Sequence, residues 1–304
     1  MLIACLCTMI SALLYSSTNF IDKFLVNDMN ESSGNVKTLL IFSSLIAGIV
    51  FSPIWLIISG FDISISLIPL ICVLLSSVVN IMAIYFYFKA LEVGDTSTVV
   101  VMFQLIPVFT YILGLIFFQE ALTTKELLGS IIIILSSIFI SIDFKNHNKS
   151  SFKVLSFMTI SSLLYAIYYI LFDVGIRNAS FNACAFYEQI GLLVIGIIFM
   201  FIGSFRTMFI KSIKTNGKKY FSLNCINEFL NIVAGILENY ANVLIPIALV
   251  NVIGRVQVIF VFVIGLIGTI FLPKLFSEKI DKNTLIQKIS CIVLSIVGFI
   301  IMFI

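Results

Sequence analysis

The chain has 304 residues, of which 61% are hydrophobic and 11% are charged, and its formal net charge is +3. Soluble domains are about half apolar and a quarter charged, so this composition excludes an ordinary soluble fold. A small, scattered positive charge also excludes a nucleic-acid-binding protein, which would carry a basic stripe on a polar face. Lipid is the solvent that suits such a chain, and we predict an all-α integral membrane protein.

Ten apolar runs of spanning length follow one another along the chain. A membrane helix needs about 20 apolar residues. Lipid offers no hydrogen-bond partner to an open backbone N–H or C=O, so each run is predicted to be helical. The runs cover residues 2–21, 37–58, 66–88, 96–117, 126–142, 153–172, 182–203, 222–243, 247–271 and 286–304. No basic segment precedes the first run, so we expect it to be a membrane span and not a cleavable signal.

The two halves of the chain align when one is shifted by about 150 positions. The matched pairs are Tyr15 with Tyr165, Asn19 with Tyr169, Asn80 with Asn231, Ala90 with Ala241, Gln104 with Arg255 and Phe109 with Phe260. Five spans in each copy force the two copies to insert in opposite orientations, as in secondary transporters whose site lies near the midplane. We therefore predict ten transmembrane helices as two inverted five-helix repeats, at residues 1–145 and 150–304.

Three motifs in the first half have a characteristic order. They are ALEVG at 90–94, QLIPVFT at 104–110 and QEALT at 119–123, followed by Gly129. In order and spacing they resemble the EamA-type module of the drug/metabolite transporter superfamily. Two such modules would cover nearly the whole chain, although Val258 replaces the proline in the second. The resemblance implies a carrier with a central cavity, but members carry amino acids, nucleotide sugars, drugs and other metabolites.

Basic residues divide unequally between the connections. Most Lys and Arg follow odd-numbered spans, whereas only Lys125 and Arg177 follow even-numbered ones. The positive-inside rule then places the odd connections in the cytoplasm and both termini outside. Members of the superfamily usually keep both termini in the cytoplasm. The two arguments conflict, and we follow the charge count.

Four ionisable residues lie well inside apolar runs: Glu188, Glu228, Glu238 and Arg255. A charge near the bilayer centre costs about 2.5–3.5 kcal/mol, so each must have a partner or face a water-filled cavity. On the predicted eighth span, Glu228 and Glu238 share one helix face with two asparagines, which predicts a polar wall. Pro107 is expected to bend the fourth span and to free a carbonyl near this cavity.

Facing polar residues on several spans predict one cavity between the halves. The predicted substrate-binding residues are Tyr15, Asn19, Asn80, Gln104, Tyr165, Tyr169, Glu188, Asn231, Glu238, Asn251 and Arg255. Arg255 is expected to hold a carboxylate or phosphate of the substrate. Glu238 or Glu188 is expected to exchange a coupling proton.

Structural alternatives exist for several of these residues. Arg255 and Glu238 could form an interhelical pair that only fixes packing, and asparagines can be interhelical hydrogen-bond partners. Glu228 is expected at the cytoplasmic mouth of its span, half solvated. Asp22 and Lys23 are expected at the cytoplasmic membrane edge.

These features predict a secondary active transporter with alternating access, located in a bacterial cytoplasmic (inner) membrane. Its expected substrate is a small polar metabolite, an amino acid or a related zwitterion. The alternative is a carrier of nucleotide sugars or other phosphorylated or organic anions. The oligomeric state, the coupling ion and the direction of transport stay open.

Two other classes were weighed against a transporter. A membrane enzyme would need clustered Asp, His or Lys with metal ligands, but the six cysteines are dispersed and His147 is the single histidine. We therefore predict no enzyme activity, no metal and no cofactor. A non-transporting scaffold has no need of costly charges in its centre. The chain also lacks a Walker-type phosphate loop, so we expect no direct coupling to ATP.

Overall fold

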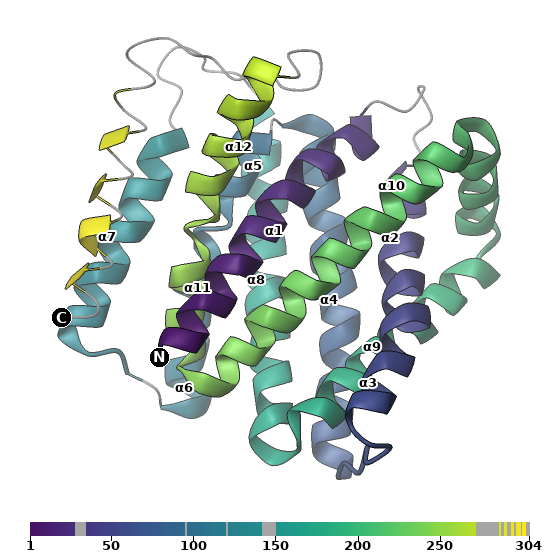
Figure 1. The fold of residues 1–304 in the computed structure, drawn as a ribbon, viewed down its shortest axis with the longest axis horizontal. Helices are drawn as coiled ribbons and strands as arrows, with labels where there is room; N and C mark the ends of the chain where they lie inside the picture. The colour runs from purple at the N-terminus through teal and green to yellow at the C-terminus, as the bar shows by residue number, and fades with distance from the viewer. Residues whose placement is uncertain are drawn as a thin grey trace.

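The computed structural model describes residues 1–27, 35–94, 96–119, 121–141 and 150–271, and scattered residues between 286 and 301. Every regular element in these ranges is helical, and the helices lie side by side in one bundle (Figure 1). The all-α prediction is therefore confirmed for this part of the chain.

The helices follow the order of the predicted apolar runs. The first half contains α1 (Leu2–Asn27), α2 (Asn35–Ile46), the π-helical turn η1 (Ala47–Phe51), α3 (Ser52–Ile58), α4 (Leu67–Val93), α5 (Thr96–Met102), α6 (Leu105–Phe118) and α7 (Thr124–Ser141). The second half contains α8 (Ser150–Asn178), α9 (Phe181–Phe201), α10 (Gly203–Leu244), α11 (Ile247–Gly254) and α12 (Gln257–Phe271).

Within the described residues, seven helical segments are long and apolar enough to cross a membrane. They are Leu2–Val26, Val36–Ile58, Leu67–Val93, Phe152–Asn178, Phe181–Phe201, Gly203–Leu244 and Ile247–Gly268. The predicted fourth span is divided into α5 and α6, and the predicted fifth is the 18-residue α7. Most of the predicted tenth span, 286–304, lies outside the described residues. The chain is thus a multi-pass membrane protein.

The helix α10 differs from the predicted eighth span. It begins at Gly203, so the basic segment around Lys211 and Lys218 is helical and not an open connection. At Gly217 the backbone leaves helical geometry, with φ 71° and ψ −166°. Glycine adopts positive φ without the steric penalty of a Cβ, so it supplies the kink between the basic part of α10 and the apolar part.

Two helix pairs join the halves. α4 packs mainly against α8, and α1 packs mainly against α10. Under the predicted repeat, α1 corresponds to α8 and α4 corresponds to α10, so the two pairs are equivalent. Figure 1 shows α1 and α10 crossing in front of α4 and α8. This arrangement encloses the space that the polar residues line.

Glycines allow α9 to approach its neighbours closely. A Cβ at Gly48 in η1 would overlap Leu193 of α9, and a Cβ at Gly191 would overlap Ser77 of α4. Small residues at helix interfaces are the usual device of membrane proteins, because close backbones increase van der Waals contact. The position of α9 brings Glu188 to the centre of the bundle.

Candidate substrate-binding cavity

A cavity between the two halves is lined largely by polar side chains. The polar residues on its wall are Tyr15, Asn19, Asp22, Ser43, Asn80, Tyr87, Tyr165, Tyr168, Tyr169, Glu188, Gln189, Glu228, Asn231, Glu238, Asn239, Arg255 and Gln257. The space open to the centres of water molecules is about 140 Å³. The wall is therefore rich in polar side chains, inside a bundle whose surface exposes many large apolar side chains.

Two helix breaks lie at positions that the repeat makes equivalent. One separates α5 from α6 at Phe103 and Gln104, and the other separates α11 from α12 at Arg255 and Val256. At both breaks, backbone N–H groups bond to carbonyls three residues back. Such bonds tighten the turn and redirect the helix. Broken helices at membrane depth are found where backbone lines a protein-enclosed cavity.

Pro107 explains the open carbonyl at the first break. In a regular helix, the N–H of residue 107 would donate to the carbonyl of Phe103, but proline has no N–H. That carbonyl instead accepts a hydrogen bond from Arg255 Nη1 at 3.2 Å, besides the tight turn bond from Ile106. The prediction that Pro107 frees a carbonyl is confirmed.

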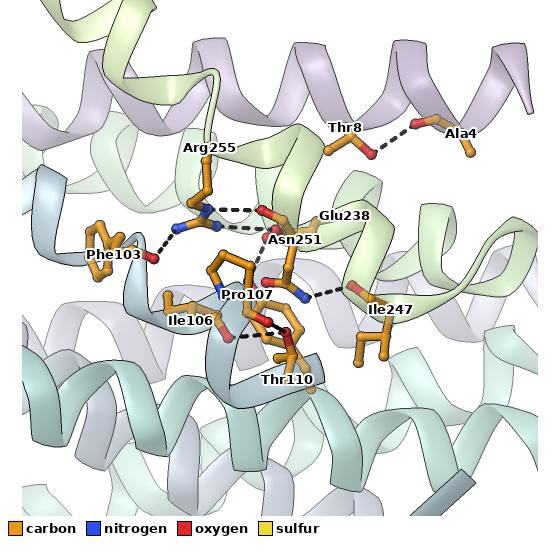
Figure 2. A network of polar contacts seen from close by, with 11 residues as sticks. Ala4, Thr8, Phe103, Ile106, Pro107, Thr110, Glu238, Ile247, Asn251 and Arg255 are labelled. Carbon is orange, nitrogen blue, oxygen red and sulfur yellow. Dashed lines mark hydrogen bonds and ion pairs between the residues drawn. The ribbon is translucent and has the colours of Figure 1, made fainter. Parts of the chain in front are cut away.

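Arg255 is the centre of a polar network that joins the two breaks (Figure 2). Its side chain is buried, and Nε donates to the carbonyl of Asn251 at 3.0 Å. Nη2 lies 3.8 Å from Glu238 Oε1, which is an ion pair but too long for a hydrogen bond. The two hydrogen bonds, from Nε and Nη1, engage two of the five guanidinium N–H groups, so the others can donate to an anionic ligand.

Adjacent tyrosines on α8 hold two carboxyl groups from other helices. The hydroxyl of Tyr169 donates to Glu238 Oε2 at 2.7 Å. The hydroxyl of Tyr168 donates to Glu188 Oε1 at 2.8 Å, and Asn239 Nδ2 donates to the same hydroxyl at 2.8 Å. Both glutamates are buried. The two hydrogen bonds fix the acid groups against the cavity without neutralising them.

Asp22 does not form the expected edge pair with Lys23, because the two side chains have different partners. It is 3% exposed and accepts hydrogen bonds from the Tyr87 hydroxyl at 3.0 Å and from Asn227 Nδ2 at 2.7 Å. The reason is that α1 continues to Asn27, beyond the expected end at residue 21. Lys23 turns away and donates to two carbonyls at the end of α4.

Glu228 is also more deeply placed than predicted. Its side chain is 3% exposed, and Oε1 accepts a hydrogen bond from Ser43 Oγ of α2 at 2.7 Å. The expected half-solvated position was therefore wrong. The cause is the upstream extension of α10, which makes Glu228 an interior residue of a long helix.

The structure brings all but two of the predicted substrate residues onto the cavity wall. The exceptions are Gln104 and Asn251, which are buried elsewhere. Asn251 Nδ2 donates to the backbone carbonyl of Ile247 within α11, and the backbone carbonyl of Asn251 accepts a hydrogen bond from Arg255 Nε. The side-chain amide of Gln104 has no hydrogen-bond partner among the described residues. That the residues on the wall bind a substrate stays a prediction.

Sequence reasoning missed several wall residues. Tyr87 bonds to Asn19 and Asp22 across helices, at separations of 68 and 65 residues. No local pattern reveals such a contact. The repeat could have revealed it, since the shift of 151 that aligns Asn80 with Asn231 also places Tyr87 on Glu238. The pairs Asn19–Tyr87 and Tyr169–Glu238 are then equivalent contacts in the two halves.

Residues 2–142 match the sequence model of the EamA-like transporter family. The similarity to this family covers slightly less than half of the chain and lies in its first half. The chain is also similar to a protein of known crystal structure, with a TM-score of 0.61 and 12% sequence identity. The alignment covers 99% of this chain and 96% of the other chain. That likeness shows the fold alone, and it extends over both halves. No curated protein sequence matches the chain.

Charge is unequally divided between the two halves of the cavity wall. From the first half, the matched family region, Asp22 is the one ionisable carboxyl group on the described cavity wall, beside asparagines and tyrosines. The second half contributes Glu188, Glu228, Glu238 and Arg255. In the described residues, no three His, Cys, Asp or Glu side chains gather as metal ligands.

Proposed function

We propose that this protein is a secondary active transporter that moves an amino acid or related zwitterion across a bacterial cytoplasmic membrane by alternating access. One observation carries the proposal. Arg255 and Glu238 face one cavity at the level of the two helix breaks, with opposite charges available to one small ligand. A charged side chain inside a membrane protein costs free energy, and such residues usually mark a substrate or ion pathway.

The bundle supports a ten-helix plan of two inverted repeats. The equivalent pairs α4–α8 and α10–α1 each join one half to the other, and the two breaks fall at matched positions. In carriers built from inverted repeats, broken helices frame a site near the midplane, and one bundle rocks against the other around it. A cavity lined by residues of both halves is consistent with this plan.

The chemistry of the wall favours a ligand with both charge signs. The unengaged N–H groups of Arg255 suit a carboxylate, which accepts two parallel hydrogen bonds from a guanidinium. The carboxyl groups of Glu188 and Glu238 suit an ammonium group. A cavity of about 140 Å³ suits a small metabolite. A nucleotide sugar carries a diphosphate, for which one cation on the described wall is a poor match.

Proton coupling is the expected driving mechanism. Glu238 and Glu188 are buried and hydrogen-bonded by neutral tyrosines, so each can bind or release a proton as the ligand leaves or arrives. Arg255 beside Glu238 links the two events, because an occupied Arg255 no longer stabilises the Glu238 carboxylate as well.

Untargeted metabolite analysis tests the proposed function. We would compare the metabolites gained or lost by the medium of three cell cultures. One produces the wild-type chain, one produces the Arg255→Met variant and one produces neither. We expect compounds with both an amine and a carboxylate to change only with the wild type. Changes confined to phosphorylated compounds, or none at all, would contradict the proposal.

A further inference from the structure

The cavity carries more acid than a zwitterion can balance. Its described wall has four carboxyl groups, from Asp22, Glu188, Glu228 and Glu238, and a single cationic side chain, Arg255. Arg255 pairs with Glu238. Buried carboxylates need a cation or protons to compensate them. An amino acid with a neutral side chain brings one charge of each sign and leaves this imbalance unchanged.

Asp22 and Glu228 form an acid pair at the end of the cavity away from Arg255. Asn227, which precedes Glu228 on α10, donates to Asp22 of α1 at 2.7 Å, so the two acids lie on facing helices at the same level. The hydrogen bonds shown for the pair come from neutral groups, the Tyr87 and Ser43 hydroxyls and the Asn227 amide. These hydrogen bonds fix the pair in position, and none of them comes from a cationic side chain.

Two asparagines beside this pair have side-chain oxygens without a hydrogen-bond partner among the described residues. A carboxylate can only accept, so Asn227 must present its Nδ2 to Asp22, which leaves its Oδ1 without a partner. Asn224, one turn earlier on α10, also has an unsatisfied Oδ1, and both residues are buried. Buried acceptors without partners cost free energy. Neither asparagine lines the cavity, so the carboxyl groups of Asp22 and Glu228 are the acceptors here that a ligand with N–H donors can reach.

The distance along α10 between Glu228 and Glu238 is similar to the length of an extended basic amino acid with a hydrogen bond at each end. Glu228 and Glu238 lie on the same stretch of α10, about 15 Å apart along its axis. Extended lysine measures roughly 7–8 Å from carboxyl carbon to side-chain nitrogen, and a hydrogen bond of about 3 Å at each end extends its reach to about 14 Å. A carboxylate on Arg255 therefore leaves a side-chain ammonium near Asp22 and Glu228.

We infer that the ligand is an amino acid with a cationic side chain, and that Asp22 and Glu228 bind its side-chain ammonium or guanidinium group. This inference rests on the proposed function and makes it more specific. The α-carboxylate lies on Arg255, the α-ammonium lies by Glu188 and Glu238, and the second positive group lies at the acid pair. The wall then holds a ligand with net positive charge.

Binding of L-lysine and L-norleucine by the purified full-length protein tests this inference. Norleucine has a methyl group in place of the side-chain ammonium, so the comparison isolates the second positive charge. We expect wild type to bind lysine at least about tenfold more tightly, as a charge-assisted hydrogen bond warrants. Asp22→Asn and Glu228→Gln should reduce the preference for lysine toward unity while norleucine still binds. Retained norleucine binding shows that these variants are folded.

The matched control is Asp62→Asn, an exposed acid between α3 and α4, which should keep the full preference. Equal wild-type affinity for lysine and norleucine would overturn the inference, as would a preference unchanged in both acid variants. A sodium requirement for norleucine binding that Glu228→Gln abolishes would also overturn it, because the pair would then hold a coupling ion. In all three cases the protein still binds an amino acid. If it bound neither lysine nor norleucine, the proposed function itself would be contradicted.

Discussion

Arg255 Nη1, at the break between α11 and α12, donates to the carbonyl oxygen of Phe103, at the break between α5 and α6, over 3.2 Å. One side chain thus ties the irregular backbone of one half to that of the other. The same guanidinium also pairs with Glu238 on the cavity wall. Ligand binding at Arg255 is therefore placed to affect how the two halves meet.

Replacing Pro107 tests the role of the open carbonyl. In Pro107→Ala, the restored N–H can donate to Phe103, so the break between α5 and α6 should straighten. Because Pro107 lies in the first turn of α6, where proline is tolerated, the melting temperature should change little. The variant should exchange substrate at least several-fold more slowly. Pro53→Ala, in the exposed first turn of α3, is the control and should transport normally. If Pro107→Ala exchanged substrate at the wild-type rate, the break between α5 and α6 would not be needed for transport.

Gly48 should be intolerant of a methyl group. In Gly48→Ala the new Cβ would overlap the Cβ and backbone of Leu193, so α9 would have to move away from η1. Overpacking of this kind costs about 1–3 kcal/mol or more, and the melting temperature in detergent should fall by several degrees. At Gly203 a Cβ meets no atom within 4 Å, so Gly203→Ala should melt like wild type. Equal melting temperatures for the two variants would disprove the close contact of η1 and α9.

Cysteine labelling tests the orientation. Lys214 on the basic part of α10 and Ser64 after α3 are both exposed, and Figure 1 places these segments at opposite ends of the bundle. In a chain whose native cysteines are replaced, Ser64→Cys should react with an impermeant reagent in intact cells. Lys214→Cys should react only after permeabilisation. The reverse pattern would place the termini in the cytoplasm, as in related carriers, and would leave the fold unaffected.

Hydropathy predicted the helices but not where they end or break. Apolar runs of about 20 residues are required by the bilayer, so their positions can be read directly from the sequence. The predicted first span ended before Asp22 because a charged pair follows. In the fold, Asp22 is stabilised by Tyr87 and Asn227, which lie 65 and 205 residues away. Such tertiary partners outweigh the local signal.

The candidate site was predictable only where its residues lie on a regular helix. Periodicity on α10 correctly placed Asn231 and Glu238 on one wall, because a regular helix fixes the direction of each side chain. At a break that regularity is lost. Gln104 aligns with Arg255 in the repeat, but only Arg255 lies on the wall. The direction of a side chain at an irregular turn depends on packing that no periodicity encodes.

Neutralising Glu238 should separate coupling from binding. Glu238→Gln keeps the side-chain shape and can still bond to Tyr169, but it cannot exchange a proton. Accumulation driven by a pH gradient should be lost, whereas exchange of labelled for unlabelled substrate should persist. Measurement of both activities in proteoliposomes distinguishes these effects, with Glu188→Gln assayed in parallel. Accumulation that survives in both variants would exclude these carboxyl groups as the coupling site.

The most direct measurement is amino-acid counterflow in proteoliposomes with wild type, Arg255→Met and Arg255→Lys. Arg255→Met keeps much of the apolar volume of the side chain but removes every donor to the ligand and to Phe103. We expect it to lose at least about tenfold in exchange rate while reconstituting and melting as a folded protein. Arg255→Lys, which keeps the charge without the bidentate geometry, should retain a measurable fraction. Wild-type exchange by Arg255→Met would contradict the account, because the buried cation would then serve packing alone.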